Sequence, residues 1–202
     1  MYQRFGLLID NRWVAASTGL SKPVHSPVSG LVVGDIPAAA MPDIDAALAA
    51  AQRGFERWRQ VPAWERAKVL RKAADLLRDR VEDVARLMST ETGKPLAEAR
   101  GETQAAADQF EWYGEEAKRI YGQTIPGRHA EERLSVIYQP VGVCVSLSAW
   151  NFPALLPARK IAAALAAGCS IIARPASEAP GACFAIGQAL VDAGLPPGAM
   201  GI

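Results

Sequence analysis

One stretch, residues 141–180, constrains most strongly what this 202-residue chain can fold into. Two short apolar runs, residues 141–147 and 170–173, lie on either side of an alanine-rich segment that ends at Gly168. An apolar run, a polar corner, an apolar segment with a glycine stop and a second apolar run are together typical of a βαβ unit. We therefore predict two parallel strands joined by a helix, in an α/β fold.

Polar residues follow both predicted strands. Asn151 lies in the corner Trp150-Asn151-Phe152-Pro153 after the first strand, and Arg174 ends the second. In open parallel sheets, ligands bind in the crevice outside the carboxyl ends of the strands. We therefore expect the Asn151 amide and the Arg174 guanidinium to converge on one cleft.

Each of these polar residues has a functional and a structural interpretation. The Asn151 amide can donate to an oxyanion, but an Asn before a helix is also a common N-cap, and spacing alone favours the cap. Arg174 and Ser177 suit a phosphate group, or else they form a turn. Arg159 lies a little over two helical turns beyond Asn151, so it faces either the cleft or solvent. The glycine fingerprint GxGxxG does not occur.

The rest of the sequence predicts ribbons and amphipathic helices around this unit. Apolar runs around polar turns predict antiparallel ribbons within residues 5–36 and 123–139. Apolar periodicity and stop residues predict helices from Pro42 to before Pro62 and over residues 64–80, 81–91, 96–121 and 181–193. The predicted buried face of the first helix consists of Ile44, Leu48, Ala51, Phe55 and Trp58. The aromatic residues expected to pack in the core are Trp58, Trp64, Phe110, Trp112 and Tyr113.

Composition excludes several classes of function. A net charge of +1, with both signs interspersed, gives no footprint for nucleic acid or for an anionic membrane. No apolar stretch reaches the length of about 18 residues that spans a bilayer, and no secretory leader is recognised, so a cytoplasmic location is expected. The odd set of cysteines (Cys144, Cys169 and Cys183) contains no CxxC pair, so neither a disulfide framework nor a metal site is predicted.

The two polar corners also carry a resemblance to a known family. With Trp150-Asn151-Phe152-Pro153 and residues 168–177 in place, the chain resembles the N-terminal portion of an NAD(P)-dependent aldehyde dehydrogenase. Within that family it is most similar to the succinate-semialdehyde dehydrogenases. The resemblance covers essentially the whole chain in order, and the supporting stretches are residues 5–10, 91–96, 110–117 and 121–126.

The resemblance implies roles for individual residues. Asn151 matches the amide that stabilises the oxyanion formed when a thiolate attacks the aldehyde. Arg159 matches the group that binds the distal carboxylate of succinate semialdehyde, with Phe152 also at the substrate. Arg174 and Ser177 match the adenosine-ribose site for NAD or NADP, and a Ser where NAD-selective members carry Glu leans toward NADP. The residues that match the wall along the nicotinamide and its ribose are Leu147, Ser148, Ala149 and Trp150.

The resemblance also implies an architecture: an incomplete Rossmann-like NAD(P)-binding domain with N-terminal helices and a protruding β-ribbon. Residues 1–121 would form the ribbon and helical part, residues 122–140 an oligomerisation ribbon, and residues 141–202 the truncated βαβ part. The implied activity is NAD(P)-dependent oxidation of a small aldehyde by a homo-oligomer. The family's nucleophilic Cys and general-base Glu have no match here, because the catalytic domain is absent. The alternatives are a catalytically inactive fragment and a family member acting on another aldehyde.

Overall fold

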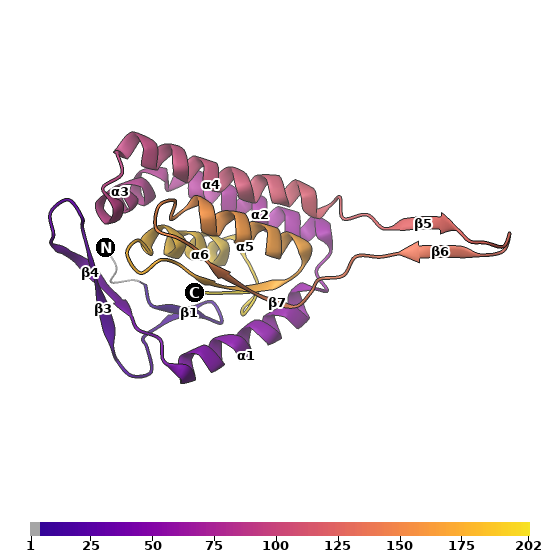
Figure 1. The fold of residues 1–202 in the computed structure, drawn as a ribbon, viewed down its shortest axis with the longest axis horizontal. Coiled ribbons are helices and arrows are strands. Elements are labelled where there is room, and N and C mark those ends of the chain that lie inside the picture. The colour runs from indigo at the N-terminus through magenta and orange to yellow at the C-terminus, as the bar shows by residue number, and fades with distance from the viewer. Residues whose placement is uncertain (1–4) are drawn as a thin grey trace.

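The predicted βαβ unit forms and lies between layers of helices (Figure 1). The computed structural model describes residues 5–202. β7 (Val143–Leu147) and β8 (Ser170–Arg174) run parallel and are joined by α5 (Leu155–Ala167), which ends at Gly168 in the left-handed conformation, with φ of 88°. The prediction for this unit and the α/β fold class are confirmed.

The remaining elements follow the predicted order along the chain. The other strands are β1 (Leu7–Ile9), β2 (Arg12–Val14), β3 (Ser21–His25), β4 (Val32–Pro37), β5 (Gln123–Pro126), β6 (Arg133–Val136) and β9 (Met200–Gly201). The other helices are α1 (Met41–Trp58), α2 (Ala63–Asp79), α3 (Val81–Thr92), α4 (Leu96–Ala117) and α6 (Gly181–Ala193). The main difference in bounds is that α4 ends at Ala117 rather than at the predicted Tyr121.

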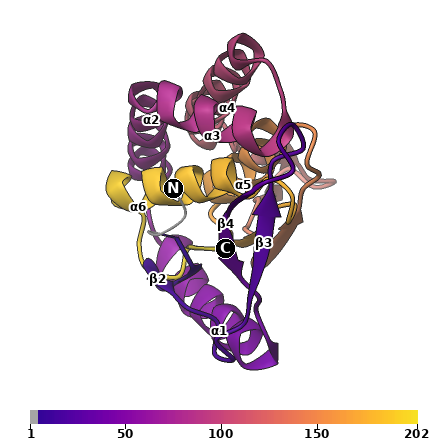
Figure 2. The same cartoon turned by 90° about the vertical axis from the view of Figure 1, so that its left-hand side faces the viewer.

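Helices cover both faces of the parallel sheet. Within residues 5–202 the strand order is β7-β8-β9, and α1 packs on one face while α5 and α6 cover the other. A further layer, α2, α3 and α4, packs on the outer side of α5 and α6. Figure 2 shows these layers from the side, with α2–α4 farthest from α1. The core between the layers is rich in alanine, which lets the helices approach closely.

The N-terminal hairpin joins the sheet next to β9. The backbone N–H of Leu8 donates to the carbonyl of Ile202 at 2.9 Å, and the N–H of Ile202 returns a bond to the carbonyl of Leu8 at 3.2 Å. Such a reciprocal pair is the antiparallel pattern. β1 therefore satisfies backbone groups beside β9, and the beginning and end of the described chain meet there (Figure 1).

The buried face of α1 differs from the predicted one. Ala51, Phe55 and Trp58 are buried as predicted, but Ile44 and Leu48 are exposed, and Ala50 and Gly54 are buried in their place. A Cβ atom at Gly54 would lie 2.0 Å from the carbonyl carbon of Gly198, so the helix backbone is in contact with that loop. Small residues permit this approach, and for that reason the large apolar residues of the first turns face outward.

The aromatic residues divide between core and surface. Trp58 and Phe110 are buried, and the indole N–H of Trp58 donates to the carbonyl of Leu165 at 2.8 Å. Trp64 and Trp112 are exposed, so the prediction that they pack in the core is wrong. The Trp64 ring instead lies beneath the ammonium of Lys118, which is 5.1 Å from the ring centroid.

The β5–β6 ribbon extends away from the body of the protein (Figure 1). Its strands pair antiparallel, from Gln123 opposite Val136 to Pro126 opposite Arg133, and every residue of both strands is exposed. Among the described residues, no helix combines the length and hydropathy needed to cross a membrane.

Two buried glutamates cap the helices that follow β7 and β8. Neither α5 nor α6 has a side-chain cap of its own. Glu102 of α4 accepts the backbone N–H groups of Ala154 and Leu155, at 2.9 and 3.1 Å, and so caps α5. Glu91 of α3 accepts the N–H of Gly181 at 3.0 Å and so caps α6. These carboxylates satisfy backbone donors that a helix N-terminus otherwise leaves unpaired.

We expect Gly54→Ala to lower the free energy of unfolding by about 1–3 kcal/mol, because the added methyl group displaces α1 from the Gly198 loop. Gly101→Ala provides the matched control, since Gly101 is an exposed glycine of α4 and a Cβ atom there would meet no other atom within 4 Å. There the change should raise the free energy of unfolding by roughly 0.5–1 kcal/mol. Urea denaturation measures both values, and a Gly54→Ala variant at least as stable as the unmodified chain would contradict the close approach at Gly54.

We also expect stability to fall as the pH rises toward 9, because burial raises the pKa of Glu91 from 4.5 to about 8 against the opposing effect of the Gly181 N–H. The folded state holds this proton more tightly than the unfolded state. The stabilisation is therefore complete below pH 4.5 and is lost as the pH passes through 8, at about 1.4 kcal/mol per unit of pKa difference.

The test for Glu91 is urea denaturation at pH 5, 7 and 9. Glu91→Gln removes the titrating proton and keeps an oxygen for the Gly181 N–H, so its stability should vary less with pH than that of the unmodified chain. Glu98→Gln, at an exposed position of α4, should leave the pH dependence unchanged. Equal pH dependence in all three proteins would show that Glu91 is ionised throughout this range.

Candidate functional site

The carboxyl ends of β7 and β8 lie side by side. Leu147 is opposite Arg174 in the parallel register, and the backbone N–H of Ser148 donates to the carbonyl of Arg174 at 3.2 Å. The corner after β7 and the segment after β8 therefore leave the sheet at the same edge. This is the edge at which open α/β sheets bind ligands.

Asn151 does not cap the helix that follows it. The first free N–H groups of α5 belong to Ala154 and Leu155, and both donate to Glu102. The Asn151 residue is exposed, and its side-chain amide has no hydrogen bond to any part of the described chain. The cap interpretation, which spacing alone favoured, is wrong, and the amide is available to a ligand.

The backbone at Asn151 is held by a lysine from another loop. The Lys94 ammonium donates to the carbonyl oxygen of Asn151 at 3.0 Å and lies 4.3 Å from the centroid of the Phe152 ring. The same ammonium forms a salt bridge with Glu102, whose side chain is almost completely buried. Lys94 and Glu102 together fix the polypeptide on both sides of Phe152.

Sequence reasoning missed both Lys94 and Glu102. The signal for Lys94 is its place between Gly93, which is left-handed with φ of 73°, and Pro95, because such neighbours fix the direction of the side chain. Glu102 lies three residues after Ala99 and four before Ala106, on the buried face of α4. An acidic residue on an otherwise apolar helix face indicates a buried partner.

An apolar surface lies beside the Asn151 amide. The exposed apolar side chains of this segment are Val145, Leu147, Trp150 and Phe152. In the same segment, the hydroxyl oxygen of Ser148 is buried and has no hydrogen-bond partner in the described chain. An exposed apolar surface of this kind suits the face of a flat ring.

Two cations occupy the first turns of α5. Lys160 donates to the carbonyl oxygen of Leu147, so it supports the end of β7. Arg159 is exposed, and no salt bridge joins it to the described residues. A free guanidinium near an apolar surface can bind a carboxylate in a bidentate manner. Beyond β8, Arg174 is exposed and Ser177 half-buried, and neither has a side-chain partner within residues 5–202.

None of the three cysteines is suited to nucleophilic attack. Cys169 and Cys183 are buried, and burial raises the pKa of the Cys183 thiol to about 12. Burial, together with the neighbouring Cys169, raises the pKa of the half-buried Cys144 thiol. A reactive cysteine needs a lowered pKa and an accessible thiolate. Cys169 and Cys183 thus occupy positions typical of small apolar side chains.

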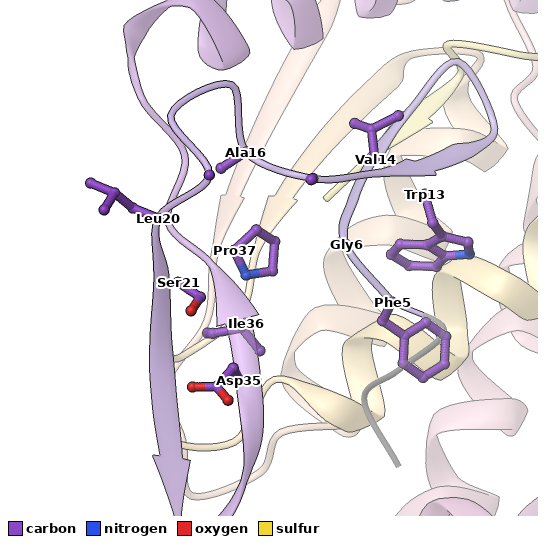
Figure 3. A pocket seen from close by; sticks show the side chains of 12 residues that line it. Phe5, Gly6, Trp13, Val14, Ala16, Leu20, Ser21, Asp35, Ile36 and Pro37 are labelled. Atoms are coloured by element: carbon purple, nitrogen blue, oxygen red, sulfur yellow. The ribbon is translucent and has the colours of Figure 1, made fainter.

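A separate cavity is lined by residues of the two N-terminal hairpins (Figure 3). It is lined by apolar groups such as Phe5, Trp13 and Ile36. Asp35 is the one charged group among the described residues around it. This cavity contains no predicted site residue.

Comparison with known proteins gives one consistent result. Residues 13–202 match the aldehyde dehydrogenase family. The chain is 43% identical to the glutarate-semialdehyde dehydrogenase of Pseudomonas aeruginosa over 96% of its own length and 40% of that relative. It is 44% identical to the succinate-semialdehyde dehydrogenase [NADP(+)] of Escherichia coli K12, with the same coverage of each. The chain therefore spans about 40% of the length of these relatives.

Solved structures agree with the sequence comparison. An NADP-dependent enzyme of E. coli superposes with a TM-score of 0.96 at 42% identity, over the whole of this chain and 42% of that one. The succinate-semialdehyde dehydrogenase of Burkholderia pseudomallei gives a TM-score of 0.95 at 39% identity, over 98% of this chain and 41% of that one. With its sequence and its fold in agreement, the chain belongs to the aldehyde dehydrogenase family.

Proposed function

We propose that this chain provides the cofactor-binding part of an NAD(P)-dependent aldehyde dehydrogenase that oxidises an ω-carboxylated semialdehyde, with succinate semialdehyde as the first candidate. The reaction takes an aldehyde, water and the oxidised nucleotide to a carboxylate, the reduced nucleotide and two protons. The proposal fits two relatives, which are named for glutarate and succinate semialdehydes.

The observation that supports this function best is the free amide of Asn151. Because Glu102 caps α5, the amide donors are not used within the fold. Attack on an aldehyde carbonyl moves negative charge onto its oxygen, and a fixed N–H donor stabilises that charge more than it stabilises the neutral carbonyl. Asn151 therefore has the exposure and the chemistry of an oxyanion donor.

The residues at the strand ends fit a dinucleotide. Exposed apolar side chains such as Leu147 and Trp150 suit the faces of a nicotinamide ring, and the unpaired hydroxyl of Ser148 suits a ribose or amide group beside it. Ala149 lies in the same wall. When bound, the nicotinamide ring supplies the hydride acceptor. Arg174 and Ser177 follow β8 and would hold the adenosine ribose, with Arg174 favouring a 2′-phosphate and hence NADP.

The substrate end of the site is assigned to α5 and the corner before it. Arg159 is a cation without a salt bridge in the described chain, and a semialdehyde carries its carboxylate at the end opposite the reacting carbon. A guanidinium that binds this carboxylate orients the aldehyde group, at the other end of the substrate, toward Asn151. Phe152 offers an exposed ring for the intervening methylene groups.

The proposal extends to the arrangement of the chain. Residues 1–121 and 141–202 would form the incomplete cofactor-binding domain, and residues 122–140 would form an oligomerisation ribbon in a cytoplasmic homo-oligomer. The exposed edges of β5 and β6 support this role, because unpaired strand edges readily pair with another chain. A specific observation also supports a second candidate, a catalytically inactive fragment: the three thiols present are buried or half-buried.

The function is tested with a chimeric enzyme in which residues 1–202 replace the matching segment of the E. coli relative. We expect it to oxidise succinate semialdehyde, and an inactive chimera would count against the proposal. Arg159→Met should raise the KM for succinate semialdehyde about 10-fold or more, since a charge-assisted hydrogen bond contributes about 1.5–3 kcal/mol.

Two comparisons make the Arg159 test specific. Butanal lacks the distal carboxylate, so its KM should be the same with and without Arg159. Arg86→Met, at an exposed position on α3, should change neither KM. An unchanged KM for succinate semialdehyde in the Arg159 variant would show that the carboxylate binds elsewhere.

The nucleotide preference is tested at Ser177. We expect Ser177→Glu in the chimera to raise the Kd for NADPH by about 10-fold, because a carboxylate repels the 2′-phosphate by roughly 1.4 kcal/mol or more, while the Kd for NADH is not raised. Glu178→Gln removes the neighbouring exposed carboxylate and should lower the Kd for NADPH, if it changes at all. Fluorescence titration measures both constants, and an unchanged ratio in the Ser177 variant would remove this residue from the ribose site.

A further inference from the structure

The corner after β7 is attached to the loop between α3 and α4 by a chain of polar contacts. Glu102 accepts the N–H groups of Ala154 and Leu155 and forms a salt bridge with Lys94. Lys94 in turn donates to the carbonyl oxygen of Asn151. One lysine therefore joins the buried carboxylate that starts α5 to the peptide group of the proposed oxyanion donor.

The backbone of Lys94 is itself held by hydrogen bonds. Its backbone N–H donates to the hydroxyl of Thr92 at 3.2 Å, and its carbonyl accepts from the hydroxyl of Ser89 at 2.7 Å. Pro95 follows it and fixes the next backbone angle. Its side chain is only 14% exposed, and the ammonium lies over the Phe152 ring. An anchor that is itself ordered can transmit order to the peptide that it binds.

The contact acts on the backbone of Asn151 and leaves its side chain free. The Lys94 ammonium is bonded to the main-chain oxygen, and the amide of Asn151 remains exposed. The corner itself contains no helix or strand, since Asn151 lies between the end of β7 and the start of α5. Without the lysine, the carbonyl group of Asn151 would have no hydrogen bond to residues 5–202. The direction of the amide would then be set less narrowly.

We propose that Lys94 is a positioning residue for the Asn151 amide: it fixes the peptide that carries the oxyanion donor and takes no part in bond making. This inference rests on the proposed function, because the donor needs a fixed direction only if it stabilises an oxyanion. A donor aimed in advance requires no reorganisation when charge develops, and misplacement by about 1 Å can lower a rate by about 100-fold.

The first test measures the order of Asn151 without any reaction. Asn11 and Asn151 are the two asparagines of the chain, so labelling with 15N-asparagine gives one backbone signal from each. Asn11 serves as an internal reference, because its side chain donates to the carbonyl of Leu195 far from Lys94. In Lys94→Met, the heteronuclear NOE of Asn151 should fall while that of Asn11 is retained.

A matched variant controls for the loss of a lysine. Lys118 has a side chain 17% exposed, forms a salt bridge with Glu115 and lies over the Trp64 ring, so it shares these features with Lys94 but does not contact the corner. Lys118→Met should leave both asparagine signals unchanged. If the heteronuclear NOE of Asn151 in Lys94→Met equals that in the unmodified chain, the proposal is overturned.

A second variant keeps the test valid if Lys94→Met does not fold because Glu102 is left as an unpaired buried charge. Lys94→Met combined with Glu102→Gln removes both charges and keeps an amide oxygen for the N–H groups of Ala154 and Leu155. The helix cap is thus retained and only the contact to Asn151 is lost. The Asn151 signal should lose order in this variant as well, and retained order would again overturn the proposal.

The second test uses the chimeric enzyme. We expect Lys94→Met to lower kcat about 10- to 100-fold, with less than a twofold change in the Kd for the nucleotide. Lys118→Met should change neither kcat nor the Kd for the nucleotide. In an Asn151→Ala background, Lys94→Met should cause little further loss, because its effect passes through Asn151.

The outcomes separate the two proposals. If Asn151→Ala leaves kcat unchanged, the oxyanion function is wrong, whatever Lys94 does. If Asn151→Ala lowers kcat and Lys94→Met does not, the function stands and the positioning role is wrong. If Lys94→Met lowers kcat by the same factor with Asn151 and with Asn151→Ala, a role that acts through Asn151 is likewise excluded.

Discussion

The capping of two helices by buried glutamate side chains is the interaction on which the arrangement of this structure depends. α5 and α6 each follow a strand of the parallel sheet after a short connection, and neither has a side-chain cap of its own. Glu102 and Glu91 supply the missing acceptors from α4 and α3. A buried carboxylate is costly unless it is paired, so these contacts fix how the outer helices sit on the βαβ unit. The same contacts that join the layers thus define where each crossover helix begins.

This arrangement explains why the local sequence is ambiguous at the candidate site. An asparagine before a helix has the side chain of a good N-cap, and nothing within the corner excludes that role. The decision is made by Glu102, which is 52 positions from Ala154 in the chain. Because Glu102 caps the start of α5, the Asn151 amide makes no hydrogen bond within the described chain. The local sequence sets the position of Asn151 in the corner, whereas a tertiary contact leaves its amide free.

Features set by local chemistry could be predicted from the sequence. The strands and helix of the βαβ unit follow from short apolar runs and a glycine stop, and Gly93, Gly168 and Gly194 all end helices in the left-handed conformation. The meeting of the two strand ends could also be predicted, since Leu147 lies opposite Arg174 at one edge of the sheet. The resemblance to aldehyde dehydrogenases supplied the residue roles that spacing left open, and those roles remain proposals.

What could not be predicted depends on which surfaces meet. Periodicity identifies an apolar face but does not show that α1 uses its smallest residues to approach Gly198, leaving Ile44 and Leu48 outside. The role of Lys94 could not be predicted either, because a lysine in a turn is usually solvated. Its contacts with Glu102 and the Asn151 carbonyl form only in the folded chain. All of these contacts lie within residues 5–202. The contact that holds the Asn151 peptide is therefore made within this chain, and the thiols of the described residues are buried or half-buried. The peptide that carries the proposed oxyanion donor is thus held without any contribution from an attacking group.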